Sequence, residues 1–227
     1  MAKVEGYVKS IDEIPSVNMN INLPAPDKML RVREIFYEPQ GEGSRAGEMS
    51  IFIRLSYCNK NCWYCDTDWS KGTLKTVDSI RKEIGEFPCK KIVFTGGEPL
   101  LQLDEEIIKY FKDFKYFLAI ETNGTLPPLK GLDYISTSPK GTVKILNECF
   151  PDGINGEIRY PIEVGKFPPD IKDLPKANYY YISPLFLGEQ KERFELVDDN
   201  LKYCLDFIRK NPEWRISVQQ HKLWGIR

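Results

Sequence analysis

The sequence has almost no excess of charge of either sign. It contains 32 Lys and Arg residues against 33 Asp and Glu residues, for a formal net charge of −1. A protein that grips nucleic acid without sequence preference needs a basic field that attracts the phosphates. The balanced charge therefore argues against nucleic acid as the direct partner and favours a small molecule.

Long apolar segments are also missing. No run reaches the roughly 18 apolar residues that a membrane-spanning helix needs. Residues 1–10 lack the apolar core of a signal peptide. We therefore expect no membrane association and a cytoplasmic location. The 227 residues, 41% of them hydrophobic, suffice for one globular domain with a sizeable core.

His221 is the only histidine. We interpret it as a packed or capping residue, with a catalytic base as the alternative. Six cysteines occur, and in a reducing cytosol they are not expected to form disulfides. Cys89, Cys149 and Cys204 stand alone without ligand spacing, so we interpret them as small buried hydrophobic residues.

The other three cysteines, Cys58, Cys62 and Cys65, have the spacing C-x3-C-x2-C. A structural zinc and a cubane iron–sulfur cluster each take four ligands, so three close thiolates suggest a [4Fe–4S] cluster with one open iron for chemistry. A single short loop also wraps a cluster with little loop-closure cost. The alternatives are a zinc site completed by His221 or Asp66, or three core thiols.

Strand and helix patterns alternate from residue 31 onward, after an irregular, Pro-containing stretch that we assign to an N-terminal extension, residues 1–30. We predict a domain at residues 31–227 with a largely parallel sheet, because strands separated by helices imply right-handed βα crossovers. Strand patterns cover residues 31–36, 50–55, 91–94, 116–120, 132–135, 157–164 and 179–182, and helical patterns cover residues 77–86, 103–114 and 198–210.

Nearly every predicted strand ends in Gly, Pro or polar residues, and the cysteine loop follows one of these strands. In parallel sheets the carboxyl ends of the strands form the active face. This alignment is the strongest link between predicted structure and function.

The cysteine loop followed by Gly96-Gly97-Glu98-Pro99 resembles the radical S-adenosylmethionine (SAM) superfamily. The resemblance narrows to the 7-carboxy-7-deazaguanine synthase family of the queuosine and deazapurine pathway. The matching motifs are Phe36-Tyr37, Gln40-Gly41-Glu42-Gly43, Phe52-Ile53-Arg54, Cys65-Asp66-Thr67-Asp68, Thr95-Gly96-Gly97-Glu98-Pro99, Glu121-Thr122-Asn123-Gly124, Ser138-Pro139-Lys140 and Gln220-His221-Lys222.

The resemblance implies a modified, incomplete (βα)6-type partial TIM barrel that assembles as a homodimer. The implied reaction converts 6-carboxy-5,6,7,8-tetrahydropterin to 7-carboxy-7-deazaguanine with loss of ammonia, using a [4Fe–4S] cluster, SAM and Mg2+. An electron donor such as flavodoxin or ferredoxin is implied as a partner. No catalytic side chain is assigned beyond the cluster and SAM.

The resemblance also implies roles for individual residues. Cys58, Cys62 and Cys65 hold the cluster, and Thr67 contacts Mg2+, with a helix N-cap as the alternative for Thr67. The SAM residues are Tyr64, Cys65, Asp66, Gly97, Ser138, Pro139, Lys140, Ser183 and Pro184, with a plain surface cation as the alternative for Lys140. The substrate residues are Pro39, Gln40, Gly41, Glu42, Arg54, Thr95, Glu121, Asn123 and Arg227.

The residue chemistry agrees with a pterin. Its amino and N–H donor edge needs carboxylate and amide partners, which Gln40, Glu42, Glu121 and Asn123 supply. Its carboxylate needs a cation, and Arg54 lies in an otherwise largely apolar strand, where a guanidinium is costly without an anion. The alternative for Arg54 is a salt bridge to a protein carboxylate.

Two positions depart from the family pattern. Ser183-Pro184 stands where the family often has Gln-Pro, and Arg227 stands where some members end in Pro, which leaves a role for its carboxylate alone. Two other function classes stay open, a radical SAM activase of a glycyl-radical enzyme and a non-enzymatic metal-binding protein.

Overall fold

The computed structural model describes residues 7–14, 19–20, 22–185 and 193–226, with the backbone alone for residues 193–198. Arg227 lies outside the described residues, as do parts of the predicted extension. The chain divides into two compact units. Unit 1 is Met1–Glu38, Met49–Thr122 and Leu126–Tyr134, and unit 2 is Pro39–Glu48, Asn123–Thr125 and Ile135–Arg227. The predicted boundary between residues 30 and 31 stays a prediction.

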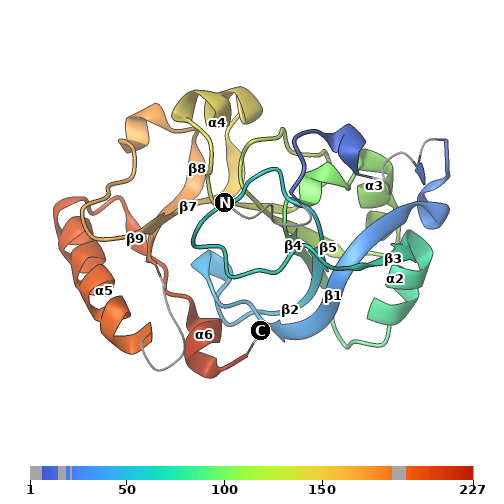
Figure 1. Cartoon of the computed structure of the whole chain (residues 1–227), viewed down its shortest axis with the longest axis horizontal. Coiled ribbons are helices and arrows are strands. Elements are labelled where there is room, and N and C mark those ends of the chain that lie inside the picture. Colours follow the sequence, from blue (N-terminus) through green and yellow to red (C-terminus); the bar gives the residue numbers. More distant parts are fainter. Residues whose placement is uncertain (1–6, 15–18, 21, 186–192, 227) are drawn as a thin grey trace. The chain divides into compact units, whose positions relative to one another are not determined.

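Unit 1 contains a five-stranded sheet of mixed direction (Figure 1). β2 pairs with β4 and β4 with β5 in parallel, whereas β1 pairs with β3 in antiparallel fashion. The strands follow the order β3 (Thr73–Thr76), β1 (Met29–Pro39), β2 (Met49–Leu55), β4 (Lys91–Gly96) and β5 (Phe117–Thr122).

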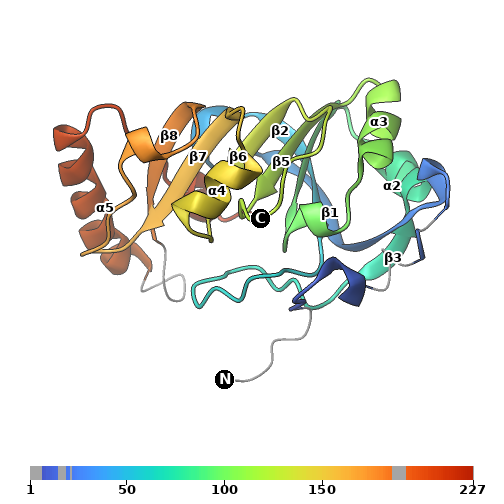
Figure 2. The same ribbon diagram turned by 90° about the horizontal axis from the view of Figure 1, so that it is seen from above.

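Two helices lie side by side in unit 1, α2 (Val77–Ile84) and α3 (Glu105–Asp113) (Figure 2). Each begins at a side-chain cap, because Thr76 accepts from the amide of Ser79 and Asp104 from that of Ile107. Each buries one apolar face, formed by Val77, Ile80 and Ile84 in α2 and by Ile107, Ile108 and Phe111 in α3. Short 3₁₀ helices occur at Ile11–Glu13, Ala25–Asp27 and Pro99–Leu101.

Unit 2 contains four strands that all pair in parallel. α5 (Arg193–Lys210) contacts β8 and β9, and the aromatic side chains of Tyr160, Tyr180 and Phe207 meet Trp214 edge-on. The strands follow the order β6 (Tyr134–Thr137), β7 (Ile154–Ile162), β8 (Ala177–Pro184) and β9 (Arg215–Ile216). The remaining elements are α4 (Val143–Cys149), α6 (Gln220–Trp224) and the 3₁₀ helices Gly43–Arg45 and Ile171–Asp173.

The predicted α/β class with a largely parallel sheet is confirmed, and every predicted strand and helix is present with shifted ends. Four elements were missed: β3, β9, α4 and α6. Each has seven residues or fewer, too few to show a period. Cys204 is buried as predicted, whereas Cys89 and Cys149 are only half-buried.

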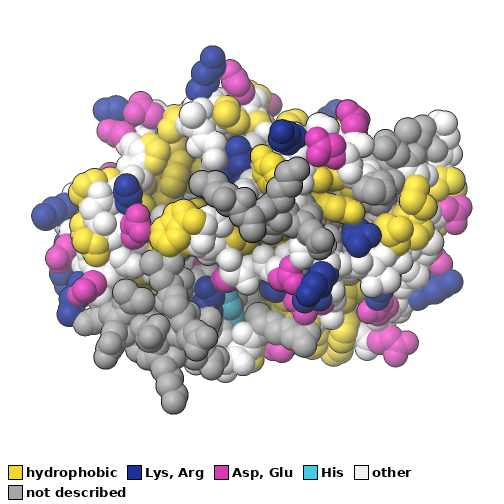
Figure 3. All heavy atoms as spheres, viewed as in Figure 1, with side chains coloured by type: hydrophobic (Ala, Val, Ile, Leu, Met, Phe, Trp, Pro, Cys, Tyr) yellow, Lys and Arg dark blue, Asp and Glu magenta, His cyan; other side chains and the backbone are white. Residues whose placement is uncertain are grey.

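Charge is evenly mixed on the face that Figure 3 shows, where Lys and Arg side chains alternate with Asp and Glu. The described helices include none that is long and apolar enough to cross a membrane.

Part of the predicted irregular extension packs against the rest of unit 1. Val8 and Ile14 are buried and form an apolar cluster with Leu101, against which Tyr57 and Leu126 also pack. In addition, the amide of Val8 donates to the carbonyl of Cys58 at 3.0 Å. Figure 2 shows this dark blue segment beside the teal loop that follows β2. The segment is thus attached by a small apolar anchor at the start of the cysteine loop.

This attachment predicts that Ile14→Ala releases the N-terminal segment without unfolding unit 1. Removing a fully buried Ile side chain typically costs about 2–5 kcal/mol, but here the segment can detach first, which limits the loss of global stability. Hydrogen exchange at the Val8 amide should rise at least about tenfold, the equivalent of about 1.4 kcal/mol. Ile11→Ala, at a side chain 42% exposed, is the matched control. Unchanged exchange at Val8 in Ile14→Ala would contradict the anchor.

Candidate functional site

The cysteine loop in unit 1 is closed at its base by backbone and side-chain contacts. The amide of Tyr57 donates to the carbonyl of Trp69 at 3.0 Å, and Ser56 Oγ donates to the carbonyl of Lys71 at 2.6 Å. The Trp69 side chain is 3% exposed and anchors the returning chain, whereas Trp63 is 69% exposed. Tyr57 has a φ of 67°, a left-handed conformation that a non-glycine residue adopts only where its surroundings enforce it.

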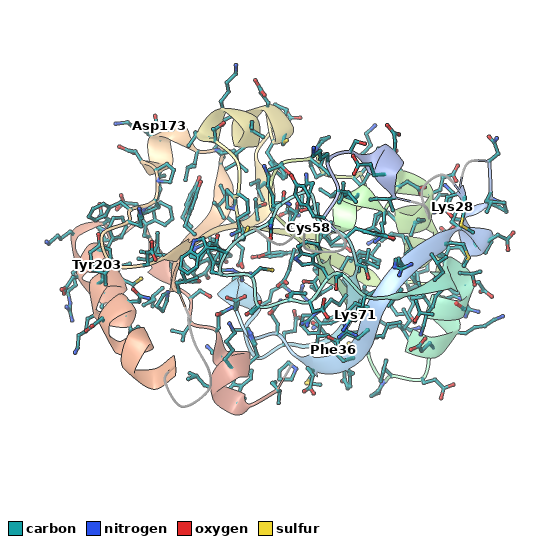
Figure 4. The ribbon with its side chains drawn as sticks, viewed as in Figure 1. Lys28, Phe36, Cys58, Lys71, Asp173 and Tyr203 are labelled. Atoms are coloured by element: carbon teal, nitrogen blue, oxygen red, sulfur yellow. The ribbon has the colours of Figure 1, made fainter. Side chains whose placement is uncertain are left out.

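The three cysteines of this loop differ in exposure. Cys58, labelled in Figure 4, is buried, Cys62 is half-buried and Cys65 is exposed. Burial raises the pKa of the Cys58 thiol to about 12, and the charges of Glu98, Cys62 and Cys65 act in the same direction. An amide hydrogen bond from Lys60 at 3.4 Å opposes this rise only in part. Cys58 is therefore a neutral thiol at neutral pH unless a metal cation stabilises the thiolate.

The Gly96-Gly97-Glu98 segment continues the pairing of β4 with β2 into the cysteine loop. The amide of Gly97 donates to the carbonyl of Leu55 at 3.0 Å, and the amide of Glu98 donates to that of Tyr57 at 2.8 Å. A Cβ on Gly97 would overlap the Tyr57 carbonyl, and one on Gly96, whose φ is 115°, would overlap that of Leu55. Both positions therefore require glycine.

Glu98 is fully buried beside this contact. Its carboxylate accepts hydrogen bonds from Thr122 Oγ1 at 2.9 Å and from the amide of Leu100 at 3.1 Å. The structural role of Glu98 was not predicted, although a carboxylate between glycines and the apolar run Pro99-Leu100-Leu101 indicates a buried, satisfied side chain.

The loop fits a cluster better than a single ion. Within the described residues, no three His, Cys, Asp or Glu side chains lie close enough to bind one metal ion. In a cubane cluster the thiolates bind separate irons and need not converge on one point. The donors are three thiols, the ligands that iron–sulfur clusters use, and the first of them is held by the close approach of the Gly97 backbone to the carbonyl of Tyr57.

A polar layer crosses the sheet of unit 1 just beyond an apolar one. Phe36, Phe52, Val93 and Ala119 form the apolar cluster, and Phe36 stacks on Phe52 with 4.9 Å between ring centroids. Two residues further along the same strands come the predicted substrate residues. Arg54 is paired in register with Thr95, and Thr95 Oγ1 donates to Glu121 Oε2 at 2.8 Å. The sheet thus brings Arg54, Thr95 and Glu121 together.

The Arg54 guanidinium has one carboxylate partner in the protein and one hydrogen-bond donor without a partner among the described residues. Nη1 donates to Glu34 Oε1 at 3.0 Å, and the guanidinium lies 5.1 Å from the centre of the Phe36 ring. The alternative of a salt bridge is therefore present. However, Nε is buried and has no hydrogen-bond partner among the described residues. A buried donor without a partner is costly, so it indicates a site for a further acceptor.

In unit 2, the loop of residues 39–48 contains the Gln40-Gly41-Glu42-Gly43 motif. The Gln40 side chain organises the loop, because its Oε1 accepts from the amides of Gly41 at 2.8 Å and Glu42 at 3.3 Å. The carbonyl of Gly41 accepts from the amide of Gln220 at 2.9 Å, and a Cβ on Gly41 would overlap the His221 ring. His221 therefore has a packing role at this loop.

The predicted SAM residues of unit 2 follow strand ends. Lys140 donates through Nζ to Ser138 Oγ at 3.0 Å and through its amide to the carbonyl of Asn123 at 2.9 Å, so these two motifs are tied together. Ser183 is buried and its hydroxyl has no hydrogen-bond partner among the described residues. Pro139, which follows Ser138 in the sequence, and Pro184, which follows Ser183, are both buried.

The remaining predicted residues of unit 1 lie in the cysteine loop. Thr67 Oγ1 lies 3.4 Å from Asp66 Oδ1, and no helix begins at Thr67, so the alternative of an N-cap is wrong. Tyr64 stacks edge-on with Trp63, and burial raises the pKa of Tyr64 to about 12. Pro39 of unit 2 is half-buried, and Arg227 lies outside the described residues.

Comparison with known proteins identifies the kind of protein that carries such a site. The family model described as the radical SAM superfamily matches residues 52–154, which include the cysteine loop and the glycine motif. The 7-carboxy-7-deazaguanine synthase of Bacteroides thetaiotaomicron is 34% identical over 201 residues, which cover 88% of this chain and all of the relative. That of Haemophilus influenzae is 36% identical over 196 residues, 85% of this chain and 92% of the relative.

Among solved structures, the crystal structure of QueE from Escherichia coli aligns with a TM-score of 0.65 at 20% identity. The alignment covers 92% of this chain and all of that one. At this identity the likeness shows the fold, a partial TIM barrel of the radical SAM type, and the predicted fold class is confirmed.

The fold and the three-cysteine loop thus define a radical SAM protein, a class that holds a [4Fe–4S] cluster and SAM. More narrowly, the chain belongs to the 7-carboxy-7-deazaguanine synthase family. The resemblance inferred from the motifs is confirmed.

The glycine contact predicts that Gly97→Ala disrupts the cysteine loop. The added methyl group meets backbone rather than a flexible side chain, so the start of the loop must move, at a cost of about 1–3 kcal/mol typical of overpacking. Anaerobically reconstituted Gly97→Ala should bind less iron and lose the cluster absorbance. Gly85→Ala is the matched control, since Gly85 has an ordinary φ of −64° and its nearest contact would be 3.2 Å. Full iron content in Gly97→Ala would contradict the assignment.

Proposed function

We propose that this chain converts 6-carboxy-5,6,7,8-tetrahydropterin to 7-carboxy-7-deazaguanine with release of ammonia, in queuosine and 7-deazapurine biosynthesis. The observation that carries the proposal is the layer of Arg54, Thr95 and Glu121 next to the glycine-clamped cysteine loop in the same unit. It combines a cluster loop with a cation and acceptors suited to a carboxylated pterin. Relatives aligned over most of this chain are named for the same reaction.

The two alternative functions find less support. A glycyl-radical activase acts on a protein and has no need of the polar layer formed by Arg54, Thr95 and Glu121. A non-enzymatic metal-binding protein has no need of a Gly97 backbone held against the cysteine loop. The named relatives belong to neither class.

In unit 1, Cys58, Cys62 and Cys65 would hold the cluster, and Tyr64, Asp66 and the backbone of Gly97 would bind SAM. When bound, the reduced cluster and SAM supply one electron and a radical that abstracts hydrogen. The protein's part is to place these groups and keep water away. Burial of Cys58 and Glu98 provides a dry side to the loop, which strengthens every polar contact made there.

The substrate's carboxylate would pair with Arg54. The unpartnered Nε, together with the remaining fork of the guanidinium, offers a charge-assisted bidentate contact to a planar anion. Glu121 would accept from the pterin's N–H edge, and the hydrogen bond from Thr95 holds its carboxylate in one orientation.

The remaining residues that we assign to the two ligands belong to unit 2. Glu42 and Asn123 present acceptors for pterin donors, with Pro39, Gln40 and Gly41 forming the backbone around Glu42. Ser138, Pro139, Lys140, Ser183 and Pro184 would contact SAM, and the buried Ser183 hydroxyl without a partner supports this role in place of the family's usual Gln. Arg227 is a further proposed substrate residue.

We further propose Mg2+ as a cofactor contacted by Thr67. A hydroxyl is a weak ligand alone, but Mg2+ keeps most of its waters and takes substrate oxygens. A homodimer and an electron donor such as flavodoxin or ferredoxin follow from the family. A reducing cytoplasm suits free thiols and a cluster.

Incubation of reconstituted protein with dithionite, SAM, Mg2+ and the pterin should yield 7-carboxy-7-deazaguanine, detected by mass spectrometry. Purified anaerobically, the protein should be brown, with about four irons per chain.

Single substitutions separate ligand from non-ligand cysteines: Cys58→Ala, Cys62→Ala and Cys65→Ala should abolish reductive SAM cleavage, whereas Cys89→Ala, Cys149→Ala and Cys204→Ala should retain it. A colourless protein with stoichiometric zinc would rule out both enzyme functions.

Arg54→Met tests the substrate rather than the superfamily. If the guanidinium pairs with the pterin carboxylate, its loss leaves a charge unpaired in a partly dry site, which typically costs about 3–5 kcal/mol. Turnover should collapse while iron content and SAM binding persist. In Arg54→Lys, pterin KM should rise at least about tenfold, because a point charge cannot reproduce the planar fork.

Arg209→Met is the control for Arg54→Met, because Arg209 lies on α5, is largely exposed and pairs only locally with Asp206. It should leave both Michaelis constants unchanged. If pterin KM were also unchanged in both Arg54 variants, Arg54 would be the structural partner of Glu34 and nothing more.

A further inference from the structure

Unit 2 buries two charged side chains that no predicted role explains, Arg159 and Glu157, and they are linked to the predicted substrate residue Glu42. Arg159 on β7 donates from Nη1 to Glu157 Oε1 at 3.1 Å and pairs through Nη2 with Glu42 Oε2 at 3.2 Å. The three side chains are 7%, 2% and 15% exposed for Arg159, Glu157 and Glu42. Burying charges in a strand gains little stability over apolar residues of the same size, so a second reason for this trio is needed.

Glu157 connects β7 to the loop that carries Glu42. Its Oε2 accepts from the amide of Ser44 at 2.9 Å, and its Oε1 accepts from Ser136 Oγ at 3.1 Å. A Cβ on Gly43, whose φ is 70°, would overlap the Glu157 carboxylate. The loop therefore lies directly on this carboxylate, and only glycine permits the approach.

The same loop is fixed from the C-terminal segment. The amide of Gly43 donates to Ser217 Oγ at 2.8 Å, and the amide of Gln220 donates to the carbonyl of Gly41 at 2.9 Å. With its backbone held at these points, the loop has little freedom, and the Arg159 contact decides where the Glu42 carboxylate points.

We propose that Arg159 and Glu157 are positioning residues that orient Glu42 for the donor edge of the pterin. This inference rests on the proposed function, in which Glu42 accepts from that edge. One guanidinium between two carboxylates leaves the trio with a net negative charge, which favours a ligand with N–H donors over a second anion. Neither Arg159 nor Glu157 needs to touch the substrate.

The inference predicts a loss in pterin binding with little effect elsewhere. Displacement of a positioning contact by about 1 Å can cost on the order of 100-fold in rate. For Arg159→Met we expect pterin KM to rise at least about tenfold. SAM KM, iron content and SAM cleavage without pterin should stay within about twofold, because the trio belongs to unit 2 and includes none of the residues assigned to the cluster or to SAM. Arg159→Lys should recover part of the loss, since it restores the charge but not the fork.

A double-mutant cycle distinguishes positioning from independent action. Glu42→Gln alone should raise pterin KM, and adding Arg159→Met should raise it no further, because the residue through which Arg159 acts is already altered. Multiplicative effects of the two substitutions, or an unchanged pterin KM in Arg159→Met, would overturn the proposal. Wild-type protein that does not convert the pterin at all would instead overturn the proposed function, so the two failures are distinguishable.

Two further variants keep the test valid if Arg159→Met fails to fold around an unpaired Glu157. Arg159→Met with Glu157→Gln removes both charges while keeping an acceptor for Ser44, and should show the same rise in pterin KM. Gly43→Ala and Gly47→Ala both add a methyl group at a left-handed φ, 70° and 83°, but only the first meets Glu157, since Gly47 faces open space. Gly43→Ala alone should raise pterin KM. Equal effects of the two glycine variants would show that Glu157 does not position the loop.

Discussion

Two backbone hydrogen bonds extend the pairing of β2 and β4 beyond the sheet. They run from Gly97 to Leu55 and from Glu98 to Tyr57, and they place the glycine motif on the first residues of the cysteine loop. Because both partners are backbone, the spacing between the two segments is set by sheet geometry and not by side-chain rotamers. The position of Cys58, the burial of Glu98 and the approach to the Gly97 backbone all depend on this contact.

In both units, strands that bear buried apolar side chains also bear charged ones. In unit 1 the side chains on one face change from apolar to polar over two residues of each strand, from Phe52 to Arg54 in β2 and from Val93 to Thr95 in β4. In unit 2 the polar side chains start deeper, with Glu157 and Arg159 in the middle of β7. The partner of Arg54 comes from β1, whereas those of Arg159 come from its own strand and from the loop of residues 39–48, so both guanidinium groups have a carboxylate partner.

Much of this arrangement was predictable because it depends on local pattern. Strand patterns, helical periodicity and strand-end motifs indicated the α/β fold and most candidate residues. The partners of those residues were not predictable. Glu34 beside Arg54, and Arg159 beside Glu42, come from distant positions, and no local rule selects them. A signal did exist for Arg159, since Glu157-Ile158-Arg159-Tyr160 alternates charge with apolar residues inside a buried strand. The short β3, β9, α4 and α6 were missed because tertiary packing, rather than periodicity, determines them.

The hydrogen bonds that join Gly97 and Glu98 to the start of the cysteine loop can form only late during protein synthesis. Glu98 is translated 40 residues after Cys58, so at about 5–20 residues per second the loop emerges about 2–8 s before the segment that holds it. Val8, by contrast, is made long before its partner, the carbonyl of Cys58. The N-terminal segment therefore cannot pack until the cysteine loop has been made, and the loop cannot form its contacts with Gly97 and Glu98 until those residues have been made. The cysteine loop can therefore reach the conformation described above only after β4 has joined the sheet.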